Sequence, residues 1–259
     1  MGKVKSLELP IKPLTQSPRI IYVYLPNDYD ENRKEKYDVL YMFDGHNLFS
    51  DEVATYGKSW GIKDYLDKTN IPLVVIGVDC NHTGRKRLDE YCPLPVSLDS
   101  WIQPITPEGD ITANFFVNKL KPYCEKKFNI HSSREHVGIG GSSMGGLMSL
   151  YCIAKYNDIY SKAACVSPTM DICLDELLNL INNANISPDT KIYMDFGSKE
   201  VKRKDRFAFC IDELLQINHA FSLHHASTYP NVVVGGTHSE ASWETIVPIF
   251  IDYLYNSNY

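Results

Sequence analysis

Runs of apolar residues of strand length recur along the chain. They occupy residues 19–26, 38–43, 72–78, 136–140, 162–167, 191–196 and 231–236. Most are continuous apolar blocks rather than alternating ones, which is typical of strands covered on both faces in a parallel sheet. The hydrophobic pattern therefore predicts a mostly parallel central sheet.

Stretches with helical periodicity lie between these runs. Residues 145–156 are apolar nearly all round, residues 205–221 are amphipathic, and residues 242–256 close the chain. Residues 112–128 also have a helical pattern, although Pro122 is expected to kink or restart that helix. Alternating strands and helices predict a three-layer α/β sandwich, in which ligands bind outside the carboxyl ends of the strands.

Composition and charge indicate the number of domains and exclude some classes of binding partner. The 259 residues are 44% hydrophobic and 22% charged, and no linker divides them, which predicts one domain over residues 1–259. A formal net charge of −6 disfavours nucleic acid or an anionic membrane as a partner, because either would need a basic stripe.

The sequence carries no targeting segment and no paired-cysteine motif. The start of the sequence lacks the apolar region of a secretory signal and no run is long enough to span a bilayer, so a cytoplasmic protein is expected. The seven cysteines include no C-x-x-C pair, so neither a disulfide framework nor a zinc site is indicated. Buried free thiols are expected instead.

One short stretch, GIGGSSMGG at residues 138–146, carries a candidate nucleophile. The pattern G-x-S-x-G fits in one frame only, with Gly141, Ser143 and Gly145 at its fixed positions. A predicted strand precedes it and a predicted helix follows, which is the context of a nucleophile elbow. Ser143 is therefore the predicted nucleophile, and a Gly/Ser-rich turn without chemistry is the alternative.

A serine hydroxyl needs a base, and His238 is the best placed of the eight histidines. In hydrolases with such an elbow the chain order is serine, acid, histidine. His238 follows the last predicted strand and precedes the final helix, whereas four other histidines come before Ser143 and three lie in or just beyond a predicted helix. His238 is predicted to take the serine proton.

The acid should lie between Ser143 and His238, just beyond residues 191–196. Asp195 lies within the strand run itself, and Glu200 lies beyond Gly197 on the loop that leaves the sheet. Glu200 is favoured because its longer side chain can reach back to orient His238. Asp195 stays open as the alternative, with Asp205 a more distant third.

Two backbone N–H groups are predicted to form an oxyanion hole. One belongs to Met144, the residue after the nucleophile. The other is expected from His46 in the loop after residues 38–43, where Gly45 lets the chain turn tightly. An ordinary turn without a catalytic donor is the alternative interpretation of that loop.

Taken together, several segments resemble one family. The segments VYLPNDYD, YDVLYMFDGHNLF, RLDEYCP, GIGGSSMGGLMSLY, KAACVSP, YMDFGSKE and GGTHSEASW, in this order, are similar to the esterase D or "putative esterase" family of α/β-hydrolases. Its relatives include enterochelin-type trilactone esterases, feruloyl and acetyl-xylan esterases, S-formylglutathione hydrolases and mycolyltransferases. The resemblance runs from about Arg19 to Trp243 and implies an α/β-hydrolase fold, a serine triad and no metal or other cofactor.

Carried over by position, the family's triad falls on Ser143, Glu200 and His238, and its oxyanion donors fall on Met144 and His46. The expected activity is carboxylic-ester hydrolysis through an acyl-enzyme, with a small-molecule or carbohydrate-linked ester as substrate. An acyltransferase with the same triad, or a catalytically silent binding module on this scaffold, is the alternative. Whether the protein forms a homo-oligomer stays open.

Residues for substrate recognition are harder to choose. Trp243, Trp60 and Tyr56 could stack on an aromatic acyl group, but packing explains them equally well. Arg87, with Arg85 and Lys86, could bind an anionic or catecholate substrate, with a solvated loop as the alternative. Trp243, Trp60 and Arg87 are therefore candidate substrate-binding residues.

Overall fold

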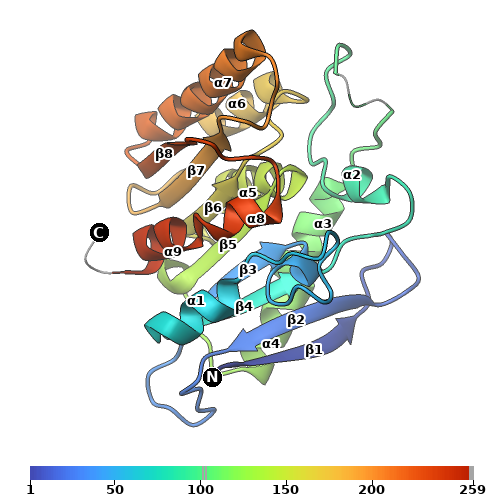
Figure 1. Ribbon diagram of the computed structural model, residues 1–259. Coiled ribbons are helices and arrows are strands. Elements are labelled where there is room, and N and C mark those ends of the chain that lie inside the picture. The colour runs from blue at the N-terminus through green and yellow to red at the C-terminus, as the bar shows by residue number, and fades with distance from the viewer. Residues whose placement is uncertain (101, 103, 257–259) are drawn as a thin grey trace.

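An eight-stranded sheet forms the centre of the protein in the computed structural model, which describes residues 1–100, 102 and 104–256. The strands lie in the order β1-β2-β4-β3-β5-β6-β7-β8 (Figure 1). Their bounds are β1 Lys3–Leu9, β2 Arg19–Leu25, β3 Asp38–Phe43, β4 Leu73–Val78, β5 Val137–Ser142, β6 Lys162–Val166, β7 Lys191–Gly197 and β8 Ser227–Val233.

The prediction of a mostly parallel sheet is confirmed. From β4 to β8 all neighbouring strands are parallel, and only the β1/β2 and β2/β4 pairs are antiparallel. Strands β4 and β5 are buried along their whole length, as strands covered by helices on both faces require.

Two strand assignments differ from the sequence pattern. The edge strand β1 was not predicted, because five of its seven residues are exposed and its pattern carries no buried face. Strand β8 begins at Ser227 rather than at residue 231, because Ser227–Val233 pairs along Lys191–Gly197 of β7. In both cases the bounds of the strand are set by its pairing with a neighbouring strand, and the local hydrophobic pattern does not reveal this pairing.

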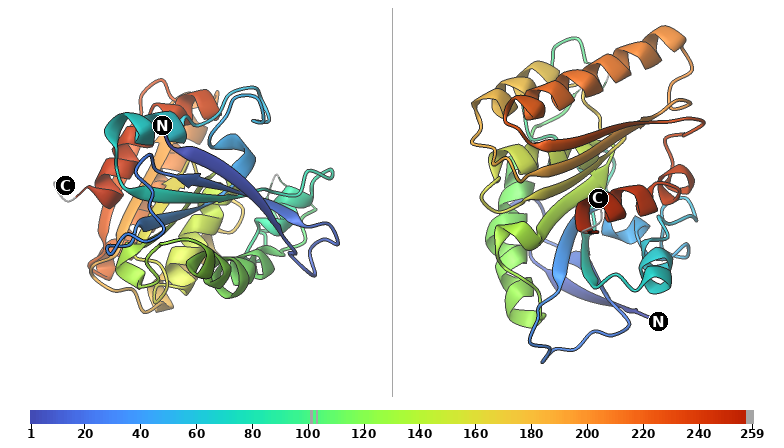
Figure 2. Two further views of the ribbon diagram at one scale, coloured as in Figure 1. Left: turned by 90° about the horizontal axis from the view of Figure 1, so that it is seen from below. Right: turned by 90° about the vertical axis from the view of Figure 1, so that its left-hand side faces the viewer.

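Helices cover both faces of the sheet (Figure 2). One face carries α1, α8 and α9, and the other carries α3 to α7. The bounds are α1 Ile62–Thr69, α2 Lys86–Glu90, α3 Gly109–Phe115, α4 Lys121–Lys127, α5 Met144–Lys155, α6 Leu174–Asn183, α7 Lys204–Leu223, α8 Glu240–Glu244 and α9 Val247–Tyr255, with the short helices η1 Gly45–Asn47, η2 Phe116–Leu120 and η3 Arg134–His136. The predicted three-layer α/β sandwich is confirmed.

Pro122 interrupts the helical stretch 112–128 as expected. A π-helical turn, Phe116–Leu120, separates α3 from α4, and Pro122 lies in the first turn of α4. There the missing N–H of proline costs no hydrogen bond.

The core consists of two apolar layers, one on each face of the sheet. All seven cysteines are buried free thiols, as the sequence predicts. Among the described residues no helix combines the length and the apolar character that crossing a bilayer requires.

Candidate active site

Ser143 occupies a sharp turn between β5 and α5. Its backbone has φ 58° and ψ −122°, a conformation that L-residues rarely adopt. Ser143 N–H donates to the Val166 carbonyl at 3.0 Å, and the Ser143 carbonyl accepts from Leu147 N–H in the first turn of α5. The strained turn therefore projects the Ser143 side chain from the carboxyl edge of the sheet at the positive end of a helix.

The glycines around Ser143 pack closely against neighbouring segments of the chain. A Cβ on Gly141 would lie 2.9 Å from the Gly145 carbonyl group, and a Cβ on Gly145 would lie 3.0 Å from the Cβ of Phe43. A Cβ on Gly146 would lie 2.8 Å from the Val166 carbonyl oxygen. Because backbone atoms cannot easily move aside, Gly141 and Gly146 have no room for a side chain, and Gly145 has little.

His238 approaches from the loop between β8 and α8. Its Nδ1 lies 2.7 Å from Glu200 Oε2, and its ring packs edge-on against Trp243 with centroids 5.1 Å apart. Ser143 and His238 both line two adjoining cavities. The structure thus brings the predicted base to the same cavity wall as the predicted nucleophile, with Glu200 bonded behind it.

The second oxygen of Glu200 is also bonded. Oε1 accepts the Gly197 N–H at 2.6 Å and the Ser167 hydroxyl at 2.7 Å, and the Glu200 side chain is 3% exposed. Ser167 in turn accepts the indole N–H of Trp243 at 3.0 Å. These contacts fix the carboxylate that faces His238.

The two competing acids lie elsewhere. Asp195 is buried in β7, where it accepts the Ser167 N–H at 2.8 Å and the Tyr193 hydroxyl at 2.8 Å. Burial raises the pKa of the Asp195 carboxyl to about 7. Asp205 pairs with Arg203 at the exposed start of α7. In the described structure, Glu200 is the one of the three that contacts His238.

The loop after β3 lies beside Ser143. Asp44 adopts a left-handed conformation with φ 56° immediately before η1, and Gly45 packs against β4, where a Cβ would lie 2.4 Å from the Gly77 backbone. His46 follows, and its side chain lines the same cavity as Ser143. Met144 is the first residue of α5, where N–H groups lack partners within the helix.

Arg87 contacts a carboxylate of the protein itself. Its Nε and Nη2 donate to Oδ1 and Oδ2 of Asp44 at 2.8 and 2.7 Å, and the guanidinium lies over the Tyr91 ring. Burial opposes the charge of Arg87, but the Asp44 carboxylate outweighs it, so the pKa of Arg87 is raised. Arg87 thus lines the cavity while holding the turn that leads to His46.

The predicted aromatic residues occupy different depths. Trp243 and the exposed Tyr56 line the cavity that contains His46. Trp60 is 2% exposed and packs behind Trp243, with ring centroids 5.4 Å apart, and against Phe250. The structure therefore places Trp60 in the packing beneath the cavity wall.

Ser167 and Thr169 also belong to the site, although no motif in the sequence marks them. Ser167 follows β6 with φ 42° and bonds both Glu200 and Trp243, and Thr169 Oγ1 lies 3.3 Å from Ser143 Oγ. Both residues lie just beyond the carboxyl end of β6, which neighbours β5 in the sheet. This position, at the edge of the sheet where ligands are expected, is the feature that could have identified them.

Two clusters of side chains could hold a metal ion within the described part of the chain. One contains His46, Asp79, Cys80 and His82 beside the cavity, and the other contains Asp38, His131 and His136. The second cluster lies at the amino ends of β3 and β5, away from Ser143.

Comparisons with known proteins identify the family of the chain. A family model described as "Putative esterase" matches residues 13–252. An uncharacterized protein, YbbA of Bacillus subtilis (strain 168), is 26% identical over 185 residues, 70% of this chain and 69% of YbbA.

Solved structures show the same fold. An IroE-like serine hydrolase from Shewanella oneidensis superposes with a TM-score of 0.72 at 16% identity, over 98% of this chain and 80% of the other. The feruloyl esterase module from Clostridium thermocellum, complexed with sinapinate, gives 0.68 at 18% identity, over 99% and 89%. The α/β-hydrolase fold expected from the resemblance is confirmed.

Proposed function

The chain belongs to the "Putative esterase" family and is a carboxylic-ester hydrolase, and from this premise we propose that Ser143, His238 and Glu200 form its catalytic triad. The observation that carries the proposal is the 2.7 Å contact between His238 Nδ1 and Glu200 Oε2, made on the wall of the cavity that Ser143 lines. The contact joins two residues that are 38 positions apart in the sequence, and the cavity brings both beside Ser143.

The chemistry follows from the roles of these groups. Ser143 Oγ attacks the ester carbonyl while His238 Nε2 takes the hydroxyl proton, and Glu200 stabilises the resulting imidazolium. His238 then returns the proton to the leaving alcohol as the carbonyl–alkoxy bond breaks, leaving an acyl group on Ser143. Water, deprotonated by His238, cleaves this acyl-enzyme and restores the free serine.

The N–H groups of Met144 and His46 are proposed as oxyanion donors. Met144 N–H lies at the start of α5, and the His46 loop is anchored by the Asp44–Arg87 ion pair and by the packing of Gly45 on β4. Donors held in place before the reaction stabilise the tetrahedral oxyanion without a reorganisation cost.

The two cavities that meet at Ser143 and His238 indicate a small-molecule ester with two unlike halves. One cavity, of about 470 Å³, has apolar walls from Pro168, Met170, Phe196 and Val201. The other, of about 530 Å³, has polar walls that include Asn47, Thr55, Asn81 and Glu240. An apolar group of aromatic size suits the first cavity, and a hydroxyl-bearing or polar group suits the second.

A serine-to-alanine pair tests the proposal within one turn of chain. Ser143→Ala should reduce kcat for p-nitrophenyl acetate by roughly a thousand-fold or more and abolish labelling by a fluorophosphonate probe. Ser142→Ala, the neighbouring serine, should keep both the labelling and most of the activity. Labelling that survives Ser143→Ala, or equal loss in both variants, would refute the assignment of the nucleophile.

A substrate panel then identifies the ester. Short acyl, feruloyl, acetyl-xylan and catecholate trilactone esters should be compared by kcat/KM, with and without an added alcohol acceptor. A feruloyl or catecholate ester preferred over acetyl esters would support the two-cavity argument. Acyl transfer to the alcohol at the expense of hydrolysis would instead identify an acyltransferase.

A further inference from the structure

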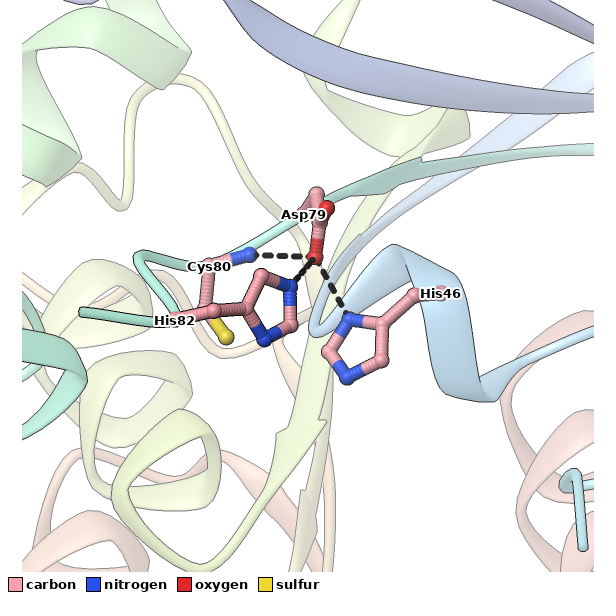
Figure 3. Close-up of side chains that lie close together, drawn as sticks. All are labelled: His46, Asp79, Cys80 and His82. Atoms are coloured by element: carbon pink, nitrogen blue, oxygen red, sulfur yellow. Dashed lines mark hydrogen bonds and ion pairs between the residues drawn. The ribbon is translucent and has the colours of Figure 1, made fainter. Parts of the chain in front are cut away.

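Four side chains with metal-ligating atoms converge beside the proposed oxyanion loop. His46 comes from η1, and Asp79, Cys80 and His82 come from the loop that follows β4 (Figure 3). One ligand atom of each lies within 4.8 Å of the others. The convergence follows from the topology, because β3 and β4 are parallel neighbours and both segments leave the sheet at its carboxyl edge.

Two imidazoles share a single carboxylate oxygen in this cluster. Asp79 Oδ1 lies 2.6 Å from His46 Nδ1 and 2.9 Å from His82 Nε2, and it also accepts the Cys80 N–H at 2.8 Å. Figure 3 shows the two rings turned toward this one point, with the Cys80 sulfur nearby. The buried His46 Nδ1 has no hydrogen-bond partner of good geometry in the described structure, although it lies close to this oxygen, so a lone pair on this nitrogen is available to a cation.

We propose that His46, Asp79, Cys80 and His82 bind a thiophilic divalent transition metal, with Zn²⁺ as the ion to which this donor set is best matched. Two imidazoles, one carboxylate and one thiolate form a four-ligand set of the kind that zinc takes in tetrahedral sites. The thiolate and imidazoles disfavour Mg²⁺ and Ca²⁺, which prefer oxygen ligands.

The surroundings of His46 suit a ligand. Its Nε2 lies 2.9 Å from Thr55 Oγ1, so this nitrogen can donate to the hydroxyl when Nδ1 binds a metal. Metal-ligating histidines usually carry such a hydrogen bond on the second nitrogen, which fixes the ring and its tautomer.

The four proposed ligands differ in their exposure to solvent. His46, Asp79 and Cys80 are buried, whereas the His82 side chain is 59% exposed. His46, Cys80 and His82 line the polar cavity that also contains Ser143. An ion can therefore reach the buried ligands from the cavity, with His82 at the exposed side of the site.

Charge also favours a dication at this point. The Asp79 carboxylate supplies a negative charge among the four ligands. Arg87, a cation near Cys80, is already neutralised by its bidentate pairing with Asp44.

The site would connect metal binding to the catalytic loop. The His46 ring would hold the ion while its backbone N–H is the proposed oxyanion donor, so occupancy should alter kcat. The metal proposal does not depend on the esterase proposal, because binding is measured without turnover.

The test uses the full chain freed of metal by a chelator. Calorimetric titration should give one tight Zn²⁺ site per chain, with no comparable site for Mg²⁺. His82→Ala should weaken Zn²⁺ binding by about ten-fold or more. His136→Ala, in the second histidine cluster, is the matched control and should leave the affinity unchanged.

Cobalt reports the sulfur ligand separately. Co²⁺ bound to the wild type should show a near-ultraviolet thiolate charge-transfer band, and Cys80→Ser should lack it. Zn²⁺ binding that is lost in His136→Ala but retained in His82→Ala would overturn the proposal. The absence of tight Zn²⁺ binding in the wild type, or a Co²⁺ spectrum without the thiolate band, would do the same.

Discussion

Glu200 Oε2 lies 2.7 Å from His238 Nδ1, while the other oxygen of the same carboxylate accepts hydrogen bonds from Gly197 N–H and Ser167 Oγ. The carboxylate is thus bonded to Gly197, the last residue of β7, and to residues that follow β6 and β8. Its position relative to the imidazole depends on the sheet and not on the conformation of one loop.

The first prediction concerns this carboxylate. Glu200→Gln keeps the size of the side chain but removes the charge that stabilises the His238 imidazolium, so kcat should fall roughly 10³–10⁴-fold with little change in KM. Asp195→Asn, two strand positions before Gly197, should cost much less activity. Steady-state kinetics on p-nitrophenyl acetate decides, and a larger loss for Asp195→Asn would transfer the role of the acid to Asp195.

The second prediction concerns Ser167, which joins Glu200 to Trp243. Ser167→Ala removes the donor to Glu200 Oε1 and leaves the buried indole N–H of Trp243 without its acceptor. The free energy of unfolding should fall by about 1–3 kcal/mol, and kcat should fall because Glu200 is less firmly held.

A double-mutant cycle separates this bond from general damage. Trp243→Phe removes the indole N–H, so adding Ser167→Ala to Trp243→Phe should cost less stability than Ser167→Ala alone. Denaturant titration measures the four free energies. Strictly additive values would show that the Ser167–Trp243 hydrogen bond carries no coupling energy.

Much of this architecture could be predicted from the sequence because it depends on residues that are close together in the chain. The buried strands are continuous apolar runs, and DVLYMF predicts β3 with the bounds that the structure gives, Asp38–Phe43. The elbow at Ser143 could be placed because glycine spacing, strand and helix are adjacent in the chain.

Contacts between distant residues could not be predicted in the same way. The pairing of Arg87 with Asp44 and the bond from Ser167 to Glu200 join positions 43 and 33 residues apart, and no periodicity relates them. The cluster of His46 with Asp79, Cys80 and His82 depends on β3 and β4 lying side by side, which a pattern of apolar runs does not specify. Strand β1 lacks a buried face and its pairing with β2 alone defines it.

The third prediction concerns Arg87. Arg87→Met keeps the apolar contacts of the side chain but leaves the buried Asp44 carboxylate unpaired, which should cost about 3–5 kcal/mol of unfolding free energy. Because Asp44 precedes the His46 loop, kcat should also fall. Adding Asp44→Asn should recover part of the lost stability. A rise in KM for anionic substrates alone, with stability unchanged, would instead assign Arg87 to substrate binding.

The fourth prediction concerns the dependence of stability on pH. Burial raises the pKa of Asp195 from its ordinary value of 3.8 to about 7 in the folded protein. Between these two values the folded state binds more protons than the unfolded state, so the contribution of Asp195 is full at low pH and is lost as the pH rises through about 7. Each unit of difference between the folded and unfolded pKa corresponds to about 1.4 kcal/mol.

Asp195→Asn isolates this contribution, because the amide keeps the shape of the side chain and does not titrate. The free energy of unfolding of the wild type, measured by denaturant titration relative to the variant, should decrease between about pH 4 and about pH 7 and stay level above that range. All other titrating groups are common to both proteins and cancel in the difference. A difference that is constant or increases with pH would contradict this prediction. It would mean that Asp195 is already ionised in the folded state. The hydrogen bonds from Ser167 N–H and the Tyr193 hydroxyl would then compensate for its burial.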